Sequence, residues 1–302
     1  MRQPTAGAPR RMRVTISSSA SRVNGFSRNP SALDRMPRRF VVTGGGLSEG
    51  PARFLVAMLR QECGLVADFV PQSEFAVRDY PERKNETLVM FSQGLAPNAR
   101  LPLAHAKCFG AAILFTSRTS ERVANSNVHV ITLPPDTEEG ILLRVIGPAC
   151  ACAAAVHFCA QLGASHTRDT LDALATPYRE RLTVPLETSL CDGATLPAVA
   201  IVAGGRYAEY VFPLRWKLLE GLYVPDPPVW DILQVAHGPF QHLYPRPFTL
   251  IALERTDAPH ETALFDRVAQ LLVPERHRMI RLLASTPGPL AWFDHDAALN
   301  LL

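Results

Sequence analysis

Residues 39–46 read Arg-Phe-Val-Val-Thr-Gly-Gly-Gly, a short apolar run that ends in three glycines. The run predicts a buried β-strand, and the amphipathic pattern over residues 49–63 predicts a helix after it. A strand, a glycine turn and a helix in this order aim backbone N–H groups at the turn, where an anion can bind. Glycine triplets are also ordinary tight turns, so a purely geometric role for Gly44, Gly45 and Gly46 stays open beside ligand contact.

The same alternation continues to the end of the chain. Further strands are predicted at residues 65–70, 87–91, 111–116, 128–133, 196–203, 248–253 and 277–284. Further helices are predicted at residues 98–109, 147–162, 167–181, 209–222, 259–272 and 289–302. Strands that alternate with helices through short loops are typical of the α/β class, with a doubly wound parallel sheet between two helical layers.

The alternation restarts after a Pro-containing stretch, which predicts two α/β units. We expect the first domain at residues 39–165, a connecting helix and linker at 166–184, and the second domain at 185–302. Residues 1–38 are rich in Arg and Ser and lack apolar periodicity. This composition fits a disordered tail, a start placed too far upstream, or a targeting segment.

Charge is distributed unevenly along the chain. The formal net charge is +3, but residues 1–39 hold nine arginines and one acid, so the other 263 residues carry 22 basic and 27 acidic groups, a net of −5. Nucleic-acid binding requires a basic face on the folded domain itself. We therefore expect no nucleic-acid partner.

The six cysteines lie in apolar surroundings and form no Cys-x-x-Cys pair. This usage favours free thiols in a reducing compartment, taken as the cytoplasm, and indicates neither a metal nor another cofactor. The apolar run 146–162 contains His157 and Gln161 and is short for a membrane span, so we expect a buried helix, no membrane contact, and His157 in the core.

Three groups suited to proton transfer lie in residues 217–239. Lys217 and Glu220 are one helical turn apart, and His237 follows a Pro-rich break. A carboxylate and an imidazole are the usual general acids and bases of enzymes. Lys217 is placed to hold the carboxylate ionised or to contact a substrate. An exposed helical Glu and a loop His are the structural alternatives.

Several short motifs occur in a fixed order along the chain. They are Thr-Gly-Gly-Gly at 43–46 with Ala-Arg-Phe at 52–54, Gln-Ser-Glu-Phe-Ala at 72–76, Ser-Gln-Gly at 92–94, Lys-Leu-Leu-Glu at 217–220 and His-Gly-Pro at 237–239. In this respect the chain resembles the sugar isomerase (SIS) family, above all the isomerase domain of glucosamine-6-phosphate synthase and the fructosamine phosphate deglycases. The resemblance covers about residues 38–302.

The resemblance implies two SIS domains and a sugar or amino-sugar derivative as ligand. It implies that Glu220 moves a proton between C1 and C2 of an open-chain sugar while His237 assists ring opening or proton transfer. In relatives the His-Gly-Pro loop reaches into the neighbouring subunit's site, which implies a homodimer. The implied substrate-binding residues are Gly44, Gly45, Gly46, Ser92, Gln93, Gly94 and Glu139.

The chain departs from the family pattern at the phosphate-binding turns. Glycines replace Thr and Ser in the first turn, and Gly94 and Pro97 replace a Ser and a Thr in the second. Three functions remain open: an aldose–ketose isomerase or deglycase, a non-catalytic sugar-binding or regulatory protein, and an enzyme of a specialised biosynthetic pathway with a non-phosphorylated substrate.

Overall fold

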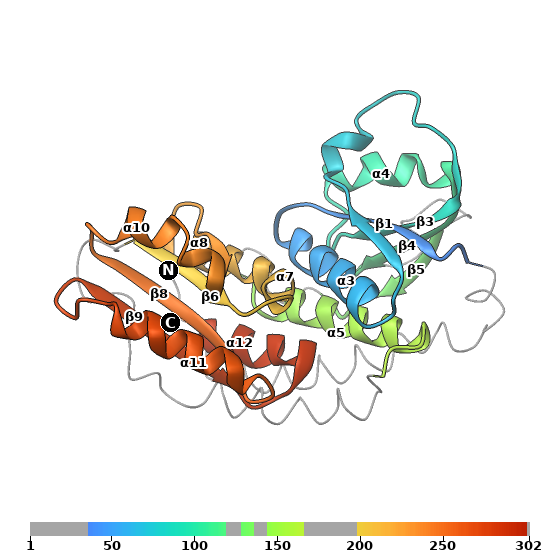
Figure 1. The fold of residues 1–302 in the computed structure, drawn as a ribbon. Coiled ribbons are helices and arrows are strands. Elements are labelled where there is room, and N and C mark those ends of the chain that lie inside the picture. Colours follow the sequence, from blue (N-terminus) through green and yellow to red (C-terminus); the bar gives the residue numbers. More distant parts are fainter. Residues whose placement is uncertain (1–35, 119–127, 136–143, 166–197, 301–302) are drawn as a thin grey trace. The chain divides into compact units, whose positions relative to one another are not determined.

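The computed structural model describes residues 36–118, 128–135, 144–165 and 198–300. The chain divides into two compact units, Met1–Ala175 (unit 1) and Thr176–Leu302 (unit 2). Each unit contains one parallel β-sheet flanked by helices (Figure 1). The α/β class with parallel sheets is thereby confirmed.

Unit 1 is built on a five-stranded sheet in the order β2-β1-β3-β4-β5, with every neighbouring pair parallel. The strands are β1 (Arg39–Gly44), β2 (Val66–Phe69), β3 (Arg83–Phe91), β4 (Phe109–Thr116) and β5 (Val128–Thr132). All five lie where the apolar runs predict them. Runs of Val, Ile, Leu and Phe suit strands that are covered on both faces.

Helices cover both faces of the unit 1 sheet. Phe158 of α5 (Ile146–Gln161) meets the rings of Phe40 and Phe115 edge-on on one face. Helix α3 (Glu49–Gln61) packs beside α5. On the other face a buried cluster joins the sheet to residues near the short helix α4 (Arg100–Ala104). The apolar helix 147–162 is thus a buried helix, as its sequence predicts, and its His157 is buried.

The helix predicted at residues 98–109 is broken into shorter pieces. It consists of a 3-10 turn at Pro97–Ala99, helix α4 and a second 3-10 turn at Ala106–Cys108. Proline is tolerated only in the first turn of an α-helix, because it lacks an N–H and its ring crowds the preceding turn. With Pro102 inside the segment, α4 begins at Arg100.

Unit 2 is built on a four-stranded parallel sheet in the order β7-β6-β8-β9. Its strands are β6 (Ala198–Ala203), β7 (Val229–Asp231), β8 (Phe248–Arg255) and β9 (His277–Ala284). Its helices are α7 (Tyr207–Val211), α8 (Arg215–Leu222), α9 (Ile232–Val235), α10 (Pro239–Leu243), α11 (Pro259–Gln270) and α12 (Ala291–Leu299).

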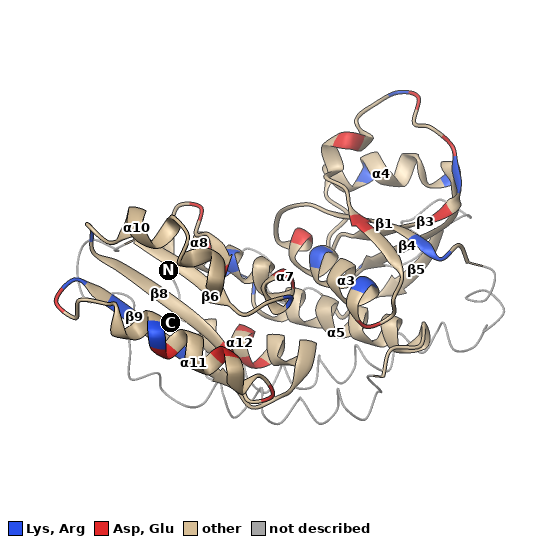
Figure 2. Ribbon diagram, viewed as in Figure 1, with Lys and Arg blue, Asp and Glu red and all other residues tan. Residues whose placement is uncertain are grey.

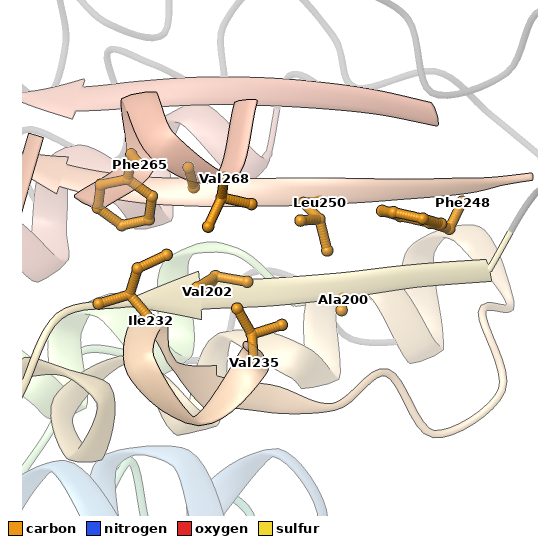
Figure 3. Packing of buried hydrophobic residues seen from close by; sticks show 9 residues of the cluster. Ala200, Val202, Ile232, Val235, Phe248, Leu250, Phe265 and Val268 are labelled. Atoms are coloured by element: carbon orange, nitrogen blue, oxygen red, sulfur yellow. The ribbon is translucent and has the colours of Figure 1, made fainter. Parts of the chain in front are cut away.

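The segment predicted as one helix at residues 209–222 is two helices, α7 and α8, joined by a 3-10 turn at Phe212–Leu214. Pro213 lies in that turn and prevents a continuous helix for the same reason as Pro102. The core of unit 2 lies between the sheet, α9 and α11, where Ile232, Val235 and Phe265 meet alternate residues of β6 and β8 (Figure 3).

Several predictions fall on residues that the structure does not describe. The tail at 1–35 and the linker helix at 167–181 are among them, so the predicted domain limits at 165 and 185 stay predictions. Each cysteine in the described ranges, Cys63, Cys108, Cys150, Cys152 and Cys159, is a free thiol. Across those same ranges, no helix has both the length and the apolar character to cross a bilayer.

Candidate functional site

The strand order of unit 1 reverses between β1 and β3. Strand β2 lies beyond β1 on one side, and β4 lies beyond β3 on the other. In open α/β sheets ligands bind outside the carboxyl ends of the strands at such a reversal. The predicted turns at 44–46 and 92–94 follow β1 and β3 directly, and Gly44 lies beside Phe91 in the sheet register. We call these two turns the unit 1 switch point.

The glycines of the first turn each have a geometric reason. A Cβ on Gly44 would collide with the backbone of Ser48, and one on Gly45 would collide with the amide of Gln72. Gly46 has a φ of 57°, in the left-handed region. The backbone of Gly45 and Gly46 is exposed. Packing thus explains the glycines, and ligand contact by their N–H groups stays a prediction.

The second turn is held by bonds to β4. The Ser92 N–H donates to the Phe115 carbonyl at 3.0 Å, so the ladder continues beyond the end of β3. The Gln93 carbonyl accepts from the backbone N–H and the hydroxyl of Ser117, at 3.0 and 2.6 Å. The Ser92 side chain is buried, whereas Gly94 is exposed. The three predicted residues therefore form one rigid turn at the end of the sheet.

A row of hydroxyl groups lies on one face of the sheet at this edge, and sequence analysis missed two of its members. Thr43 pairs with Met90, and Met90 pairs with Leu114, so side-chain alternation places Thr43, Ser92 and Thr116 on the same face. The Thr43 Oγ1 is buried and has no hydrogen-bond partner among the described residues. The signal for Thr43 and Thr116 was their position as polar residues at strand ends.

Two arginines also contact the second turn, and neither was predicted. Arg118 follows β4, and its Nε donates to the Gly94 carbonyl at 3.3 Å. Arg144 precedes α5, and its Nη1 donates to the Gln93 Oε1 at 3.3 Å. A Cβ on Gly147 would occupy the place of the Gln93 amide, so this glycine lets the amide lie against the first turn of α5.

Glu139 lies in the segment 136–143, outside the described residues, so its role stays a prediction. A metal centre was not expected. Within the described ranges no group of three or more His, Cys, Asp or Glu side chains is arranged to hold a metal ion.

Helix α8 carries Lys217 and Glu220, and the lysine is anchored within unit 2. The Lys217 Nζ lies 3.0 Å from the Asp296 Oδ1 and donates to the Asn300 Oδ1 at 2.7 Å. Lys217 is 7% exposed and Asp296 is fully buried. The ion pair of Lys217 thus joins α8 to α12 rather than to Glu220, which is partly buried one turn further on. Figure 2 shows the acidic residues along α12 in red.

The His-Gly-Pro loop is exposed and internally braced. Gly238 has a φ of 106°, which favours glycine, and its N–H donates to the Gln241 Oε1 at 2.6 Å. The Gln241 amide in turn donates to the Ala236 carbonyl at 3.0 Å. Pro239 begins α10, where a missing N–H costs nothing. His237 is therefore presented to solvent on a loop of fixed shape.

Unit 2 has its own strand reversal, between β6 and β8, which we call the unit 2 switch point. It is filled by side chains of the unit itself. The Glu261 carboxylate lies against Gly204, where a Cβ would collide with it. It accepts from the Arg255 Nη2 at 2.9 Å, and the Arg255 guanidinium lies 4.6 Å from the Tyr207 ring centre. Burial raises the pKa of Tyr207 well above its ordinary value.

No protein-family profile matches the chain, and no curated protein matches it in sequence. Its structure, however, is similar to solved structures. Tagatose-6-phosphate ketose/aldose isomerase from Escherichia coli superposes with a TM-score of 0.73 at 15% identity, covering 99% of this chain and 94% of that one.

Two further neighbours have related activities in their names. The C-terminal domain of glucosamine-fructose-6-phosphate aminotransferase from Francisella tularensis gives a TM-score of 0.69 at 13% identity, covering 97% of this chain and 92% of that one. Glucosamine-6-phosphate deaminase from Thermotoga maritima gives 0.66 at 13% identity, covering 96% and 92%. At these identities the likeness establishes the fold. The chain has the fold of the SIS-domain phosphosugar isomerases.

Proposed function

We propose that the chain is an SIS enzyme that performs proton-transfer chemistry on a sugar or amino-sugar derivative in the cytoplasm, as an aldose–ketose isomerase or a deglycase. The observation that carries the proposal is the unit 1 switch point. Two turns chosen from sequence motifs, 44–46 and 92–94, follow adjacent strands at the one reversal of the described unit 1 sheet. That is the place where an open α/β sheet binds its ligand.

Glu220 is the proposed base. Isomerisation through an enediol requires a carboxylate above the carbon acid and a polarising group at the sugar oxygens. Helix α8 is fixed to α12 by the buried Lys217–Asp296 ion pair, so the carboxylate one turn further on is held on a rigid element. In this proposal Lys217 positions Glu220 through the helix and does not touch the substrate.

His237 is the proposed partner of Glu220, acting in the site of the other subunit of a homodimer. Its exposure on a braced loop suits a side chain that works outside its own unit. The switch point of unit 1 supplies the substrate contacts, with Ser92, Gln93 and the turn glycines, and with Glu139 as a further contact.

A hydrogen-exchange assay tests the chemistry whatever the net reaction is. Protein is incubated in D2O with fructose 6-phosphate, glucosamine 6-phosphate or fructose, and deuterium at C1 and C2 is followed by NMR. Moving a proton between these carbons through a base exposes it to solvent. Glu220→Gln should lower the exchange rate at least about 100-fold, the lower end for general-base catalysis.

The matched control is Glu275→Gln, because Glu275 is an exposed carboxylate of the same unit before β9. It should leave the exchange rate unchanged. Undiminished exchange in Glu220→Gln would remove the catalytic role of Glu220. Binding of the same sugars without any exchange in the wild type would replace the enzyme by a sugar-binding protein.

A mixing experiment tests the shared site. Glu220→Gln and His237→Asn chains are each expected to be inactive, and the two are co-expressed with different tags so that the mixed dimer can be purified. If Glu220 and His237 of one site come from different subunits, one of the two sites in the mixed dimer is intact and activity returns. No recovery would place both residues in the same subunit's site. Light scattering measures the mass of the assembly.

A further inference from the structure

The unit 1 switch point carries positive charge on one side. Arg118 and Arg144 come from different elements, and they donate to Gly94 and Gln93, which are adjacent in the chain. Both bonds are 3.3 Å long, beyond the usual 2.9–3.0 Å of an N–H···O bond. Arg118 uses only its Nε in this bond, and its Nη2 lies 3.9 Å from the point where a Cβ of Gly94 would stand.

The described segments that form this side of the switch point offer Arg118 no opposite charge. The segments 92–97 and 116–118 and the first turn of α5 contain no Asp or Glu. Arg118 forms no ion pair with a described carboxylate. The acid near the first turn, Glu49, is already bound by the Arg53 Nε at 2.5 Å. A guanidinium group in such surroundings favours a ligand that brings negative charge.

An independent observation also indicates a ligand here. The Thr43 Oγ1 is fully buried at the carboxyl end of β1 and lacks a partner among the described residues. Buried hydroxyl groups in proteins are nearly always hydrogen-bonded. Thr43 shares a sheet face with Ser92 and Thr116, and the other threonine already uses its hydroxyl, because Thr116 Oγ1 donates to the Gln93 carbonyl.

We infer that Arg118 and Arg144 bind an anionic oxygen group of the ligand at the unit 1 switch point, with Thr43 as a neutral hydrogen-bonding partner. The inference rests on the proposed function for the location of the ligand. A phosphate and a carboxylate are both matched by guanidinium forks, and each accepts paired N–H bonds. The chain thereby recognises the anion by side-chain charge, where the resembling family relies on Ser and Thr hydroxyls.

Calorimetric titration with three probes of one carbon skeleton tests the inference. Glucose is neutral at C6, glucose 6-phosphate carries a phosphate there, and glucuronate carries a carboxylate. The wild type should bind at least one charged probe more tightly than glucose, and the tighter of the two identifies the group. Arg118→Gln and Arg144→Gln should each weaken the binding of that probe about 10-fold or more and leave glucose unaffected.

Arg100→Gln is the control, because Arg100 is an exposed arginine on α4 of the same unit. It should bind all three probes as the wild type does. The inference is overturned if glucose binds as well as both charged probes, or if Arg118→Gln and Arg144→Gln retain wild-type affinity for the charged probe. Equal losses for charged and neutral probes would also overturn it, because they indicate a general loss of structure.

Binding and chemistry fail separately in these experiments. Glu220→Gln should keep the arginine-dependent preference for the charged probe, because the base lies in another unit. Arginine-dependent binding without hydrogen exchange in D2O would remove the catalytic proposal and retain the anion site. Hydrogen exchange that is unchanged in both arginine variants, with no preference for a charged probe, would do the reverse.

Discussion

The two sheets reverse their strand order in the same way, and the molecule uses the two reversals differently. At the unit 1 switch point, glycine backbone is exposed and two arginines donate to the second turn. At the unit 2 switch point, the Glu261 carboxylate covers Gly204 and pairs with Arg255. The same topology therefore offers a ligand position in one unit and is closed by an internal ion pair in the other.

This difference shows that strand order alone does not make a site. A switch point provides strand ends and helix ends, but the side chains around it decide whether they meet a ligand or one another. In unit 2 the polar groups bond among themselves and stabilise the fold. In unit 1 the Thr43 hydroxyl has no partner among the described residues, which is the signature of a place built for something else.

Removing the ion pair of unit 2 should have the largest effect on stability. Glu261→Gln keeps the shape of the side chain but leaves Arg255 without its close carboxylate, because Asp257 lies 3.8 Å away. Loss of one partner of a buried pair should lower the free energy of unfolding by about 3 kcal/mol. Urea unfolding followed by circular dichroism measures it.

Asp266→Asn is the control for this experiment. Asp266 also pairs with an arginine, Arg281, but its side chain is 51% exposed. Exposed ion pairs contribute at most about 1 kcal/mol. If Glu261→Gln costs no more than Asp266→Asn, the ion pair at Gly204 does not hold unit 2 together and the contrast with unit 1 is lost.

The same added methyl group should have different effects at the two switch points. Gly204→Ala places a Cβ against the Glu261 carboxylate, which is held by Arg255, and should cost about 2 kcal/mol through overpacking. Gly94→Ala meets only the Arg118 Nη2, at 3.9 Å, and should change stability by less than about 0.5 kcal/mol. Thermal melts of the pair decide the matter, and equal losses would mean that unit 1 is closed too.

The smallest effect separates two buried threonines at neighbouring strand ends. Thr43→Val removes a hydroxyl that has no described partner and should raise the free energy of unfolding by up to about 1 kcal/mol. Thr116→Val removes a hydroxyl that bonds both Gln93 and Arg118 and should lower it by about 1–2 kcal/mol. If Thr43→Val destabilises as much as Thr116→Val, Thr43 is a structural residue and the argument for a ligand beside it fails.

The sequence predicted the strands well and the helices less well. Hydrophobic runs bounded by glycine and polar residues are local signals, and each described strand lies at a predicted position. The helices at 98–109 and 209–222 were predicted as continuous because their apolar spacing is helical. Pro102 and Pro213 divide them, and α8 consequently begins at Arg215, two residues before Lys217.

The candidate site was predicted in part. Gly44–Gly46 and Ser92–Gly94 were placed correctly at strand ends by their motifs, since a turn follows its strand in the chain. Arg118 and Arg144 were not found, because each lies beside a segment whose contact with residues 93–94 depends on the packing of β4 and α5. The partner of Lys217 was not found either, since Asn300 is 83 residues away in the chain.

The sequence by itself determined the α/β class, the position of each described strand and the turns that end β1 and β3, because strand periodicity and turn chemistry act over a few residues. Only the tertiary structure decided that β1 and β3 are neighbours, that Lys217 belongs to Asp296, and that Glu261 closes one switch point while two arginines flank the other. Those outcomes depend on side chains distant in the chain competing for the same space and the same charge.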